Sequence, residues 1–284
     1  MSMIATPAPA TARQSTTRPI ELRDEARRPG MPLLWFDGEL TRADTPQAPL
    51  TTHAMHYGTG VFEGIRSYAT REGAAVFRLP EHLERMRKGA DLLGIDFDVD
   101  AAFDATLQTL RANGHRDAYV RPLAWLGNGA DNVTVGLDVP GLSQHFMVLT
   151  LPTVVHLNGK RSRLTMSPWK RNPASSLPPL KLCGAYVNSI LAKRESRLRG
   201  FDEALFADGE GYVVECTGAN VFMVRGGDVT AVAHRDALPG ITRETVIALS
   251  GAQARPVTHH ELLDADEVFV CGTAAEVAPI SALD

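Results

Sequence analysis

The sequence has few cysteines and no long hydrophobic run. Its three cysteines, Cys183, Cys216 and Cys271, are an odd number without metal-ligand spacing. This pattern argues against a disulfide framework and a metal site and favours a reducing compartment, so we expect a cytoplasmic protein. No apolar stretch approaches the roughly 20 residues needed to cross a bilayer, and the N-terminus has no apolar signal core, so we expect no membrane association.

An excess of charge of one sign is also missing. The formal net charge is −4, and acidic and basic residues are interspersed along the chain. Nucleic-acid binding needs a basic face, so we expect no nucleic-acid partner, and small molecules remain as candidate ligands. What is present is the composition of an ordinary globular protein, with 44% hydrophobic and 22% charged residues in 284. That length is sufficient for two domains with a sizeable core.

The chain divides into a tail and two regions of mixed structure. Residues 1–30 are rich in Ala, Thr, Pro and Arg without hydrophobic periodicity, which predicts a disordered tail. Residues 31–140 contain strand patterns and two segments of helical spacing, over 81–94 and 100–114, and are expected to form a small α/β domain. Residues 141–284 contain short strands joined by tight turns, which favours a larger, mainly antiparallel domain. The predicted fold class is therefore α/β (α+β), with a domain boundary near Pro140.

One lysine stands in surroundings that do not suit a charge. Pro178, Pro179, Leu180 and Leu182 surround Lys181. Burial among apolar groups disfavours the ammonium form and lowers the pKa of a lysine, which would make the amine nucleophilic. The alternative is a solvated lysine in front of the helix expected over 185–199. The composition alone favours this second interpretation, because most lysines lie at the surface.

Three further features are compatible with a site. Glu215 ends an apolar strand, where a carboxylate is costly unless a cation faces it. The turn at Gly240 leads into a helix whose first N–H groups could bind an anion, and Gly272-Thr273-Ala274 forms a second turn of small residues. Each feature also has an ordinary structural explanation: a buried ion pair, a helix cap and a plain turn. Together, an amine, a carboxylate and two anion cradles are the partners that pyridoxal 5'-phosphate requires.

With these features in place, the sequence resembles a known family. It is similar to the class IV (fold type IV) pyridoxal-phosphate-dependent aminotransferases, and most similar to the branched-chain amino acid aminotransferases. The motifs that carry the resemblance follow the family order along most of the chain. They are the segments 56–66, 77–82, 119–123, 172–186, 212–222, 238–242 and 272–276. The resemblance implies a two-domain fold with a small N-terminal α/β domain and a larger cofactor-binding domain.

The resemblance also implies roles for individual residues. Lys181 would form a Schiff base with the cofactor and then move a proton between the substrate Cα and the cofactor, and Glu215 would keep the pyridine nitrogen protonated. The expected cofactor-binding residues are Lys181, Glu215, Arg78, Tyr186, Gly240, Ile241, Thr242 and Thr273. The expected substrate-binding residues are Tyr57, Phe62, Gly64, Tyr119, Arg121, Thr273 and Ala274. Arg121 would receive the distal carboxylate of glutamate.

The expected activity is transfer of the amino group of branched-chain or similar hydrophobic L-amino acids to 2-oxoglutarate. The sequence departs from the branched-chain pattern at Leu142, at Ala219 and in the proline-rich run before Lys181. Transamination of D-amino acids or (R)-amines, and lyase chemistry on 4-amino-4-deoxychorismate, therefore stay open, as does a protein that binds the cofactor without catalysis. The family places its active site where two subunits meet, so we expect a homodimer.

Overall fold

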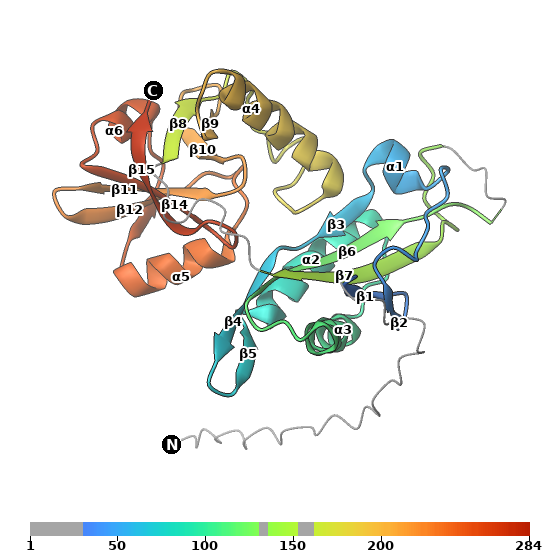
Figure 1. Cartoon of the computed structure of the whole chain (residues 1–284). Helices are drawn as coiled ribbons and strands as arrows, with labels where there is room; N and C mark the ends of the chain where they lie inside the picture. Colours follow the sequence, from blue (N-terminus) through green and yellow to red (C-terminus); the bar gives the residue numbers. More distant parts are fainter. Residues whose placement is uncertain (1–30, 131–135, 153–161) are drawn as a thin grey trace, which may run out of the picture.

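The computed structural model describes residues 31–130, 136–152 and 162–284, so the tail expected over 1–30 lies outside the described residues. Figure 1 shows two lobes, with the N-terminal strands in one and the C-terminal strands in the other. Each lobe is built around its own sheet. No helix in the described part of the chain has the length and apolar character of a membrane span.

The N-terminal sheet has seven strands and is antiparallel throughout its recorded pairings. Its order is β2-β1-β7-β6-β4-β5, with β3 also paired to β6. The central strand β6 buries every second residue, as expected for a strand with one face on a core. The strands are β1 (Leu33–Phe36), β2 (Glu39–Arg42), β3 (Gly60–Phe62), β4 (Ile65–Thr70), β5 (Gly73–Val76), β6 (Ala118–Leu126) and β7 (Gln144–Pro152).

Two helices pack against this sheet, α2 (Leu79–Leu93) and α3 (Val99–Asn113). Both end at a glycine with a positive φ, as the sequence predicted. The N-cap of α3 is Asp98, whose side chain accepts a hydrogen bond from the Ala101 N–H at 3.0 Å, two residues earlier than the sequence indicated. A short helix, α1 (His53–Tyr57), was not predicted, because the glycines that follow it masked its single turn.

The C-terminal sheet has eight strands in the order β10-β9-β8-β15-β14-β11-β12-β13. The pairs β8–β9, β8–β15 and β12–β13 are parallel, and the other four are antiparallel, so the domain is more mixed than a meander of hairpins. The strands are β8 (Ser162–Met166), β9 (Glu203–Ala207), β10 (Val213–Cys216), β11 (Asn220–Arg225), β12 (Asp228–Val232), β13 (Gln253–Arg255), β14 (Glu267–Gly272) and β15 (Glu276–Leu283).

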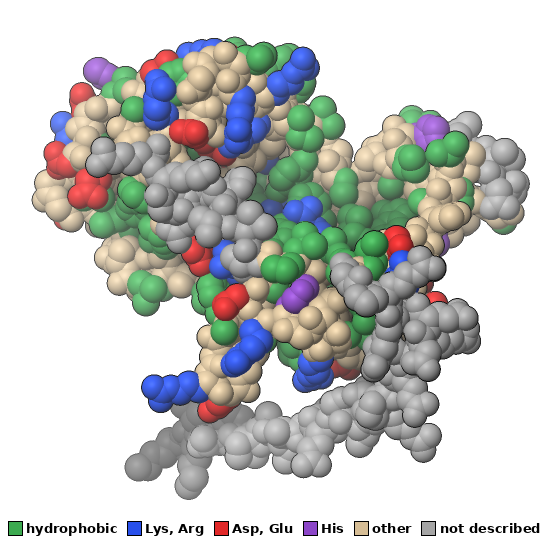
Figure 2. All heavy atoms as spheres, in the orientation of Figure 1, with side chains coloured by type: hydrophobic (Ala, Val, Ile, Leu, Met, Phe, Trp, Pro, Cys, Tyr) green, Lys and Arg blue, Asp and Glu red, His purple; other side chains and the backbone are tan. Residues whose placement is uncertain are grey.

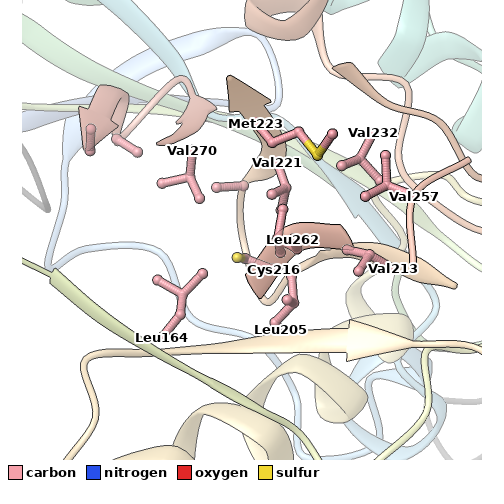
Figure 3. Close-up of a cluster of buried hydrophobic side chains, with 13 residues drawn as sticks. Leu164, Leu205, Val213, Cys216, Val221, Met223, Val232, Val257, Leu262 and Val270 are labelled. Carbon is pink, nitrogen blue, oxygen red and sulfur yellow. The ribbon is translucent and has the colours of Figure 1, made fainter. Parts of the chain in front are cut away.

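Three α-helices accompany this sheet in the described chain: α4 (Tyr186–Leu198), α5 (Ile241–Ser250) and α6 (His259–Leu263). A turn of 3-10 helix over Cys183–Ala185 leads directly into α4. Figure 3 shows the core between the strands, where Val221, Met223 and Val270 converge with Leu164 and Leu205. This core keeps the strand ends that carry Glu215 and Thr273 in a fixed relation, because close-packed interiors do not deform continuously.

The expected domain boundary near Pro140 is too early by one strand. Strand β7 pairs with β1 and β6, so it belongs to the N-terminal sheet. The change from one sheet to the other therefore falls between Pro152 and Ser162. The buried strand pattern of β7 was recognised in the sequence, but pattern alone does not show which sheet a strand joins.

Candidate active site

A cavity of about 600 Å³ lies between the two domains and takes residues from both. Figure 2 shows Lys and Arg side chains within a hollow between the lobes, with hydrophobic side chains around them. Most of the residues expected from the sequence line this cavity: Phe62, Gly64, Tyr119, Arg121, Lys181, Tyr186, Glu215, Ile241, Thr242, Thr273 and Ala274. Tyr57, Arg78 and Gly240 do not line it.

Lys181 is held between the two domains. Its carbonyl accepts a hydrogen bond from the Phe62 N–H at 3.1 Å, next to a bridge between Val61 and Leu182. The amine Nζ donates to the Tyr186 hydroxyl at 2.8 Å and lies 5.4 Å from the centroids of the Phe62 and Tyr186 rings. The amine therefore faces the cavity in an aromatic environment, and its side chain is partly exposed.

Two glycines allow the lysine segment to approach α1 this closely. A Cβ on Gly58 would lie 2.7 Å from the Cα of Gly184, and Gly58 also has a φ of +69°. The Gly184 N–H donates to the Gly58 carbonyl at 3.1 Å. A larger residue at position 58 would push the segment that carries Lys181 away from the N-terminal domain.

Glu215 is a buried carboxylate with few donors. Its Oε1 lies 2.9 Å from Arg171 Nε, and its Oε2 accepts from the Leu238 N–H at 3.1 Å. A longer contact of 3.4 Å joins Oε2 to the Asn220 side-chain nitrogen. Burial raises the pKa of Glu215 to about 7, because the charges of Arg171 and Lys181 and the Leu238 N–H compensate only part of the desolvation. Such a carboxyl gains stability from a further cation beside it.

The first turn of α5 and the turn after β14 provide N–H groups and hydroxyls at one end of the cavity. Ile241 and Thr242 open α5, whose N-cap, Gly240, makes no side-chain capping bond. A Cβ on Gly240 would lie 1.9 Å from the Asn220 Oδ1, so the close approach of β11 requires a glycine here. Thr273 lies opposite, between β14 and β15. Free N–H groups at a helix N-terminus favour an anion, and a phosphate fits this chemistry.

Two arginines lie near this end, and they differ in role. Arg78, one of the cofactor-binding residues that the family resemblance implied, lies outside the cavity lining. Its guanidinium contacts Glu81 at 2.8 Å, Glu244 at 3.2 Å, the Ile241 carbonyl at 3.1 Å and the Thr245 hydroxyl at 3.2 Å. Arg85, about two helical turns further along α2, lines the cavity. Only the direction of α2 shows which of the two side chains lines the cavity, and the phosphate-binding role of either arginine stays a prediction.

Elsewhere in the cavity lining, aromatic groups surround a guanidinium. Arg121 lies 4.5 Å from the centroid of the Phe62 ring, and its Nε donates to the Tyr119 hydroxyl at 3.2 Å. A Cβ on Gly64 would lie 2.4 Å from that hydroxyl, so Tyr119 reaches Arg121 only over a glycine. The guanidinium is thus partly screened by rings, and the surroundings can accept an apolar group as well as an anion.

Comparisons with known proteins agree with this geometry. Residues 60–283 match the model of the class IV amino-transferases. A branched-chain-amino-acid aminotransferase of Pseudomonas aeruginosa is 34% identical over 264 residues, which are 89% of this chain and 85% of that protein. The chain belongs to the class IV aminotransferase family. It has the two-domain fold type IV architecture that the resemblance implied.

Solved structures of class IV aminotransferases superpose on most of the chain. The branched-chain aminotransferase of Thermoproteus uzoniensis, in a complex with norvaline, has a TM-score of 0.84 and 37% identity, covering 90% of this chain and 88% of that one. The branched-chain amino acid aminotransferase of Thermobaculum terrenum, in its PLP-form, has a TM-score of 0.80 and 34% identity, covering 89% and 86%.

Several cavity residues of this class IV aminotransferase were not predicted. Arg85 and Arg171 reach the site from outside the recognised motifs, and Asn220 lies within the motif 212–222 but was given no role. The carboxylate of Glu215 had signalled that some cation must face it, but the sequence did not say which one. Ala219 lines the cavity, whereas Leu142 is buried in a separate core cluster with Val61 and Met86.

Proposed function

We propose that this class IV aminotransferase uses pyridoxal 5'-phosphate to move the amino group of branched-chain or similar hydrophobic L-amino acids to 2-oxoglutarate. The proposal rests on three features that meet in one cavity. They are a lysine amine, a buried carboxylate whose desolvation is only partly offset, and a helix N-terminus whose N–H groups can bind an anion. These groups come from different parts of the chain, so their convergence is a property of the fold.

Residues of the cavity fit three separate groups of the cofactor: its aldehyde, its ring nitrogen and its phosphate. When bound, pyridoxal phosphate supplies an aldehyde that condenses with amines and a protonated ring that withdraws electrons from the substrate Cα. Lys181 holds the aldehyde end, and Glu215 holds a proton at the ring nitrogen. That proton supplies the cation that Glu215 lacks, which makes the two groups complementary.

Lys181 also moves the proton of the reaction. With the cofactor bound, the Nζ of Lys181 would be the base that accepts the proton from the substrate Cα and returns it. Tyr186, which accepts a hydrogen bond from Nζ at 2.8 Å, keeps the amine on one face of the site. The rings of Phe62 and Tyr186 lie beside the amine and reduce its contact with water.

The phosphate group is bound by Arg85, by the N–H groups of Ile241 and Thr242 at the start of α5, and by Thr273. Arg85 takes the place that the sequence had assigned to Arg78, because it is the guanidinium that lines the cavity. A guanidinium and a helix N-terminus both favour an oxyanion, and the two act on the same end of the ligand.

Substrate selection is assigned to the end with Arg121. Its charge pairs with the distal carboxylate of 2-oxoglutarate or glutamate, while the rings of Phe62 and Tyr119 contact a branched aliphatic side chain. The N–H groups of Thr273 and Ala274 bind the α-carboxylate. One pocket can serve both substrates because aromatic faces partly screen the guanidinium from water.

We further propose a homodimer in which each subunit completes the other's site. Tyr57 lies outside this chain's cavity and is 44% exposed, although the family motif places it in the pocket. Met55, beside it on α1, and Val187 and Ile190 on α4 are exposed at 61%, 56% and 62%. A second copy that covers these side chains would bring Tyr57 into its own cavity. Light scattering on the purified protein should give twice the chain mass.

A cytoplasmic location is part of the same proposal. Cys183, Cys216 and Cys271 are all free thiols, and burial raises the pKa of Cys271 to about 12. Free, unreactive thiols accord with a reducing compartment. Cell fractionation with an antibody to the chain tests this assignment.

A substrate panel tests the proposed reaction. Holoenzyme is mixed with L-leucine, D-alanine or an (R)-amine, and the visible absorption band of the cofactor is followed. L-leucine should remove the band and 2-oxoglutarate should restore it, while D-alanine and the amine leave it unchanged. Loss of the band with D-alanine but not with L-leucine would overturn the substrate assignment.

A further inference from the structure

A second buried carboxylate, Glu63, lies directly behind the cavity. It follows β3 between two cavity residues, Phe62 and Gly64, and its side chain is fully buried on the opposite side, against α2. Its Oε1 accepts from Arg85 Nε at 2.6 Å, and its Oε2 accepts from the second Arg85 nitrogen at 2.9 Å. This is the two-point geometry in which a carboxylate fixes the plane of a guanidinium.

His82 holds the carboxylate from the other side. Its ring is almost fully buried, and Nδ1 lies 2.8 Å from the Glu63 Oε2. An ionised carboxylate only accepts, so Nδ1 carries the hydrogen and donates it. His82 and Arg85 stand three residues apart on α2 and therefore share one face of the helix. Glu63 is thus fixed by two side chains of the same helix.

Arg85 retains donors for a ligand. Its guanidinium has five N–H groups, and three of them donate within the described chain: two to Glu63 and one to the Pro239 carbonyl at 2.8 Å. Pro239 is two residues before the first residue of α5. The remaining N–H groups belong to a side chain that lines the cavity beside the anion cradle.

We propose that Glu63 and His82 are positioning residues that set the guanidinium of Arg85 to bind the cofactor phosphate. The inference rests on the proposed function and goes beyond it in assigning a role to two side chains that the ligand does not touch. Arg78 provides the contrast, because its carboxylate partners Glu81 and Glu244 are largely exposed, and its two other contacts are with neutral groups, the Ile241 carbonyl and the Thr245 hydroxyl. An exposed pair fixes a guanidinium poorly, whereas a buried two-point pair removes its rotational freedom.

The competing explanation is that the cluster only ties the two domains together. Arg85 does connect α2 with the Pro239 carbonyl of the C-terminal domain. The two explanations differ in what they predict for ligands with and without a phosphate. A domain tie would affect every ligand of the cavity, whereas a phosphate-positioning cluster affects only ligands that carry the phosphate.

The experiment titrates the full-length protein, freed of cofactor, with pyridoxal 5'-phosphate and with pyridoxal, which lacks the phosphate. The variants are Glu63→Gln, Arg85→Ala and the double substitution, and the absorbance of the bound ligand gives each dissociation constant. Glu84→Gln is the matched control, because Glu84 pairs with Arg87 on the exposed side of the same helix. Thermal unfolding of each variant shows whether it is folded at the temperature of the titration.

We expect Glu63→Gln to weaken the binding of pyridoxal phosphate at least tenfold and the binding of pyridoxal less than twofold. Glu84→Gln should change neither dissociation constant. In the double variant the loss should be no larger than with Arg85→Ala alone, because Glu63 acts through Arg85. Equal weakening of both ligands, or a loss that adds to that of Arg85→Ala, would overturn the inference.

Substitutions of His82 give a second test that leaves both charges in place. The side-chain amide of His82→Asn can still donate to Glu63, whereas His82→Phe cannot. Preserved phosphate selectivity in the Asn variant and reduced selectivity in the Phe variant support the role, and identical behaviour contradicts it. If the wild-type protein binds neither ligand through Lys181, the proposed function itself fails, which is a different outcome from normal binding that is insensitive to Glu63.

Discussion

Glu63 and Glu215 are both buried carboxylates within hydrogen-bond reach of an arginine, yet they have opposite acid strengths. Glu63 accepts from two nitrogens of Arg85 and from His82, and although burial alone would raise its pKa, these donors lower it to about 2. For Glu215 burial prevails over Arg171 and the Leu238 N–H, and its pKa rises to about 7. The number and geometry of donors, and not burial itself, decide which form of a buried acid is stable.

The difference separates two uses of a carboxylate in one site. Glu63 has its compensating charge within the chain, so it holds other groups in position. Glu215 is only partly compensated, so it is stabilised by a cation that the ligand brings. A protonated pyridine nitrogen is such a cation, and this is why we assign the ring to Glu215 and the phosphate end to the cluster of Glu63.

The largest effect is expected on catalysis, at Glu215. Replacement by Gln removes the negative charge and keeps the shape, so the ring nitrogen is no longer held protonated. We expect kcat to fall by about 10²–10³-fold, the usual loss when one preorganised electrostatic contact is removed. Steady-state kinetics with L-leucine and 2-oxoglutarate measure it, and an unchanged kcat would contradict the role of Glu215. Glu84→Gln serves as the control with unaltered kinetics.

The next effect concerns stability, at Glu63. The substitution Glu63→Ala leaves Arg85 and His82 without their carboxylate in a buried position, which should cost about 3–5 kcal/mol of unfolding free energy. Glu84→Ala breaks an exposed pair and should cost at most about 1 kcal/mol. Urea unfolding of cofactor-free protein compares the two. Similar losses of unfolding free energy at the two positions would contradict the view that Glu63 has its compensating charge within the chain.

The third effect is a dependence of stability on pH, with a sign set by the raised pKa of Glu215. Between its ordinary value of 4.5 and the folded value of about 7, the folded protein keeps a proton that the unfolded chain has lost. The contribution of Glu215 to the stability of the cofactor-free protein therefore falls as pH rises through this window, by roughly 3 kcal/mol, and is constant above it. The lowered pKa of Glu63 acts below this window, because its contribution is lost only as pH falls from 4.5 toward 2.

Urea unfolding at about pH 5 and about pH 8 isolates this contribution if wild type is compared with Glu215→Gln. The difference in unfolding free energy between the two proteins should change with pH in the absence of cofactor. This dependence on pH should shrink when pyridoxal phosphate is saturating. A difference that does not vary with pH would contradict the raised pKa.

The smallest effect is expected at Arg78, the arginine that Glu63 does not touch. Its guanidinium contacts Glu81 and Glu244 outside the cavity lining. Arg78→Ala should weaken pyridoxal phosphate by less than about threefold, which corresponds to the ~0.7 kcal/mol or less typical of exposed ion pairs. Arg85→Ala is the comparison and should weaken it much more. The reverse order would restore the assignment made from the sequence.

The sequence indicated several of the residues that line the cavity, but not the side chains that contact and orient them. Lys181 and Glu215 could be recognised because their neighbours are unsuited to a charge, and the turns at Gly240 and Gly272 because small residues mark them. Arg85 and Arg171 could not, because each is an ordinary arginine whose direction is set by the packing of α2 or by the segment after β8. Glu63 stood within a recognised motif, but only the fold shows that it faces away from the cavity.

The fold class was predicted correctly, but the pairing of some strands was not. Helices α2 and α3 were anticipated from local periodicity and capping glycines. The membership of β7 in the first sheet and the parallel pairs of β8 depend on contacts between distant segments, which local patterns do not encode. The error in the boundary near Pro140 has this origin.

The central claim is that Lys181 binds the cofactor, and one measurement tests it directly. Holoenzyme is reduced with borohydride and digested, and the peptides are analysed by mass spectrometry. The account predicts the mass of a phosphopyridoxyl group on the peptide that contains Lys181, and its loss in Lys181→Ala. An unmodified Lys181, or the same label on a different lysine, would contradict it.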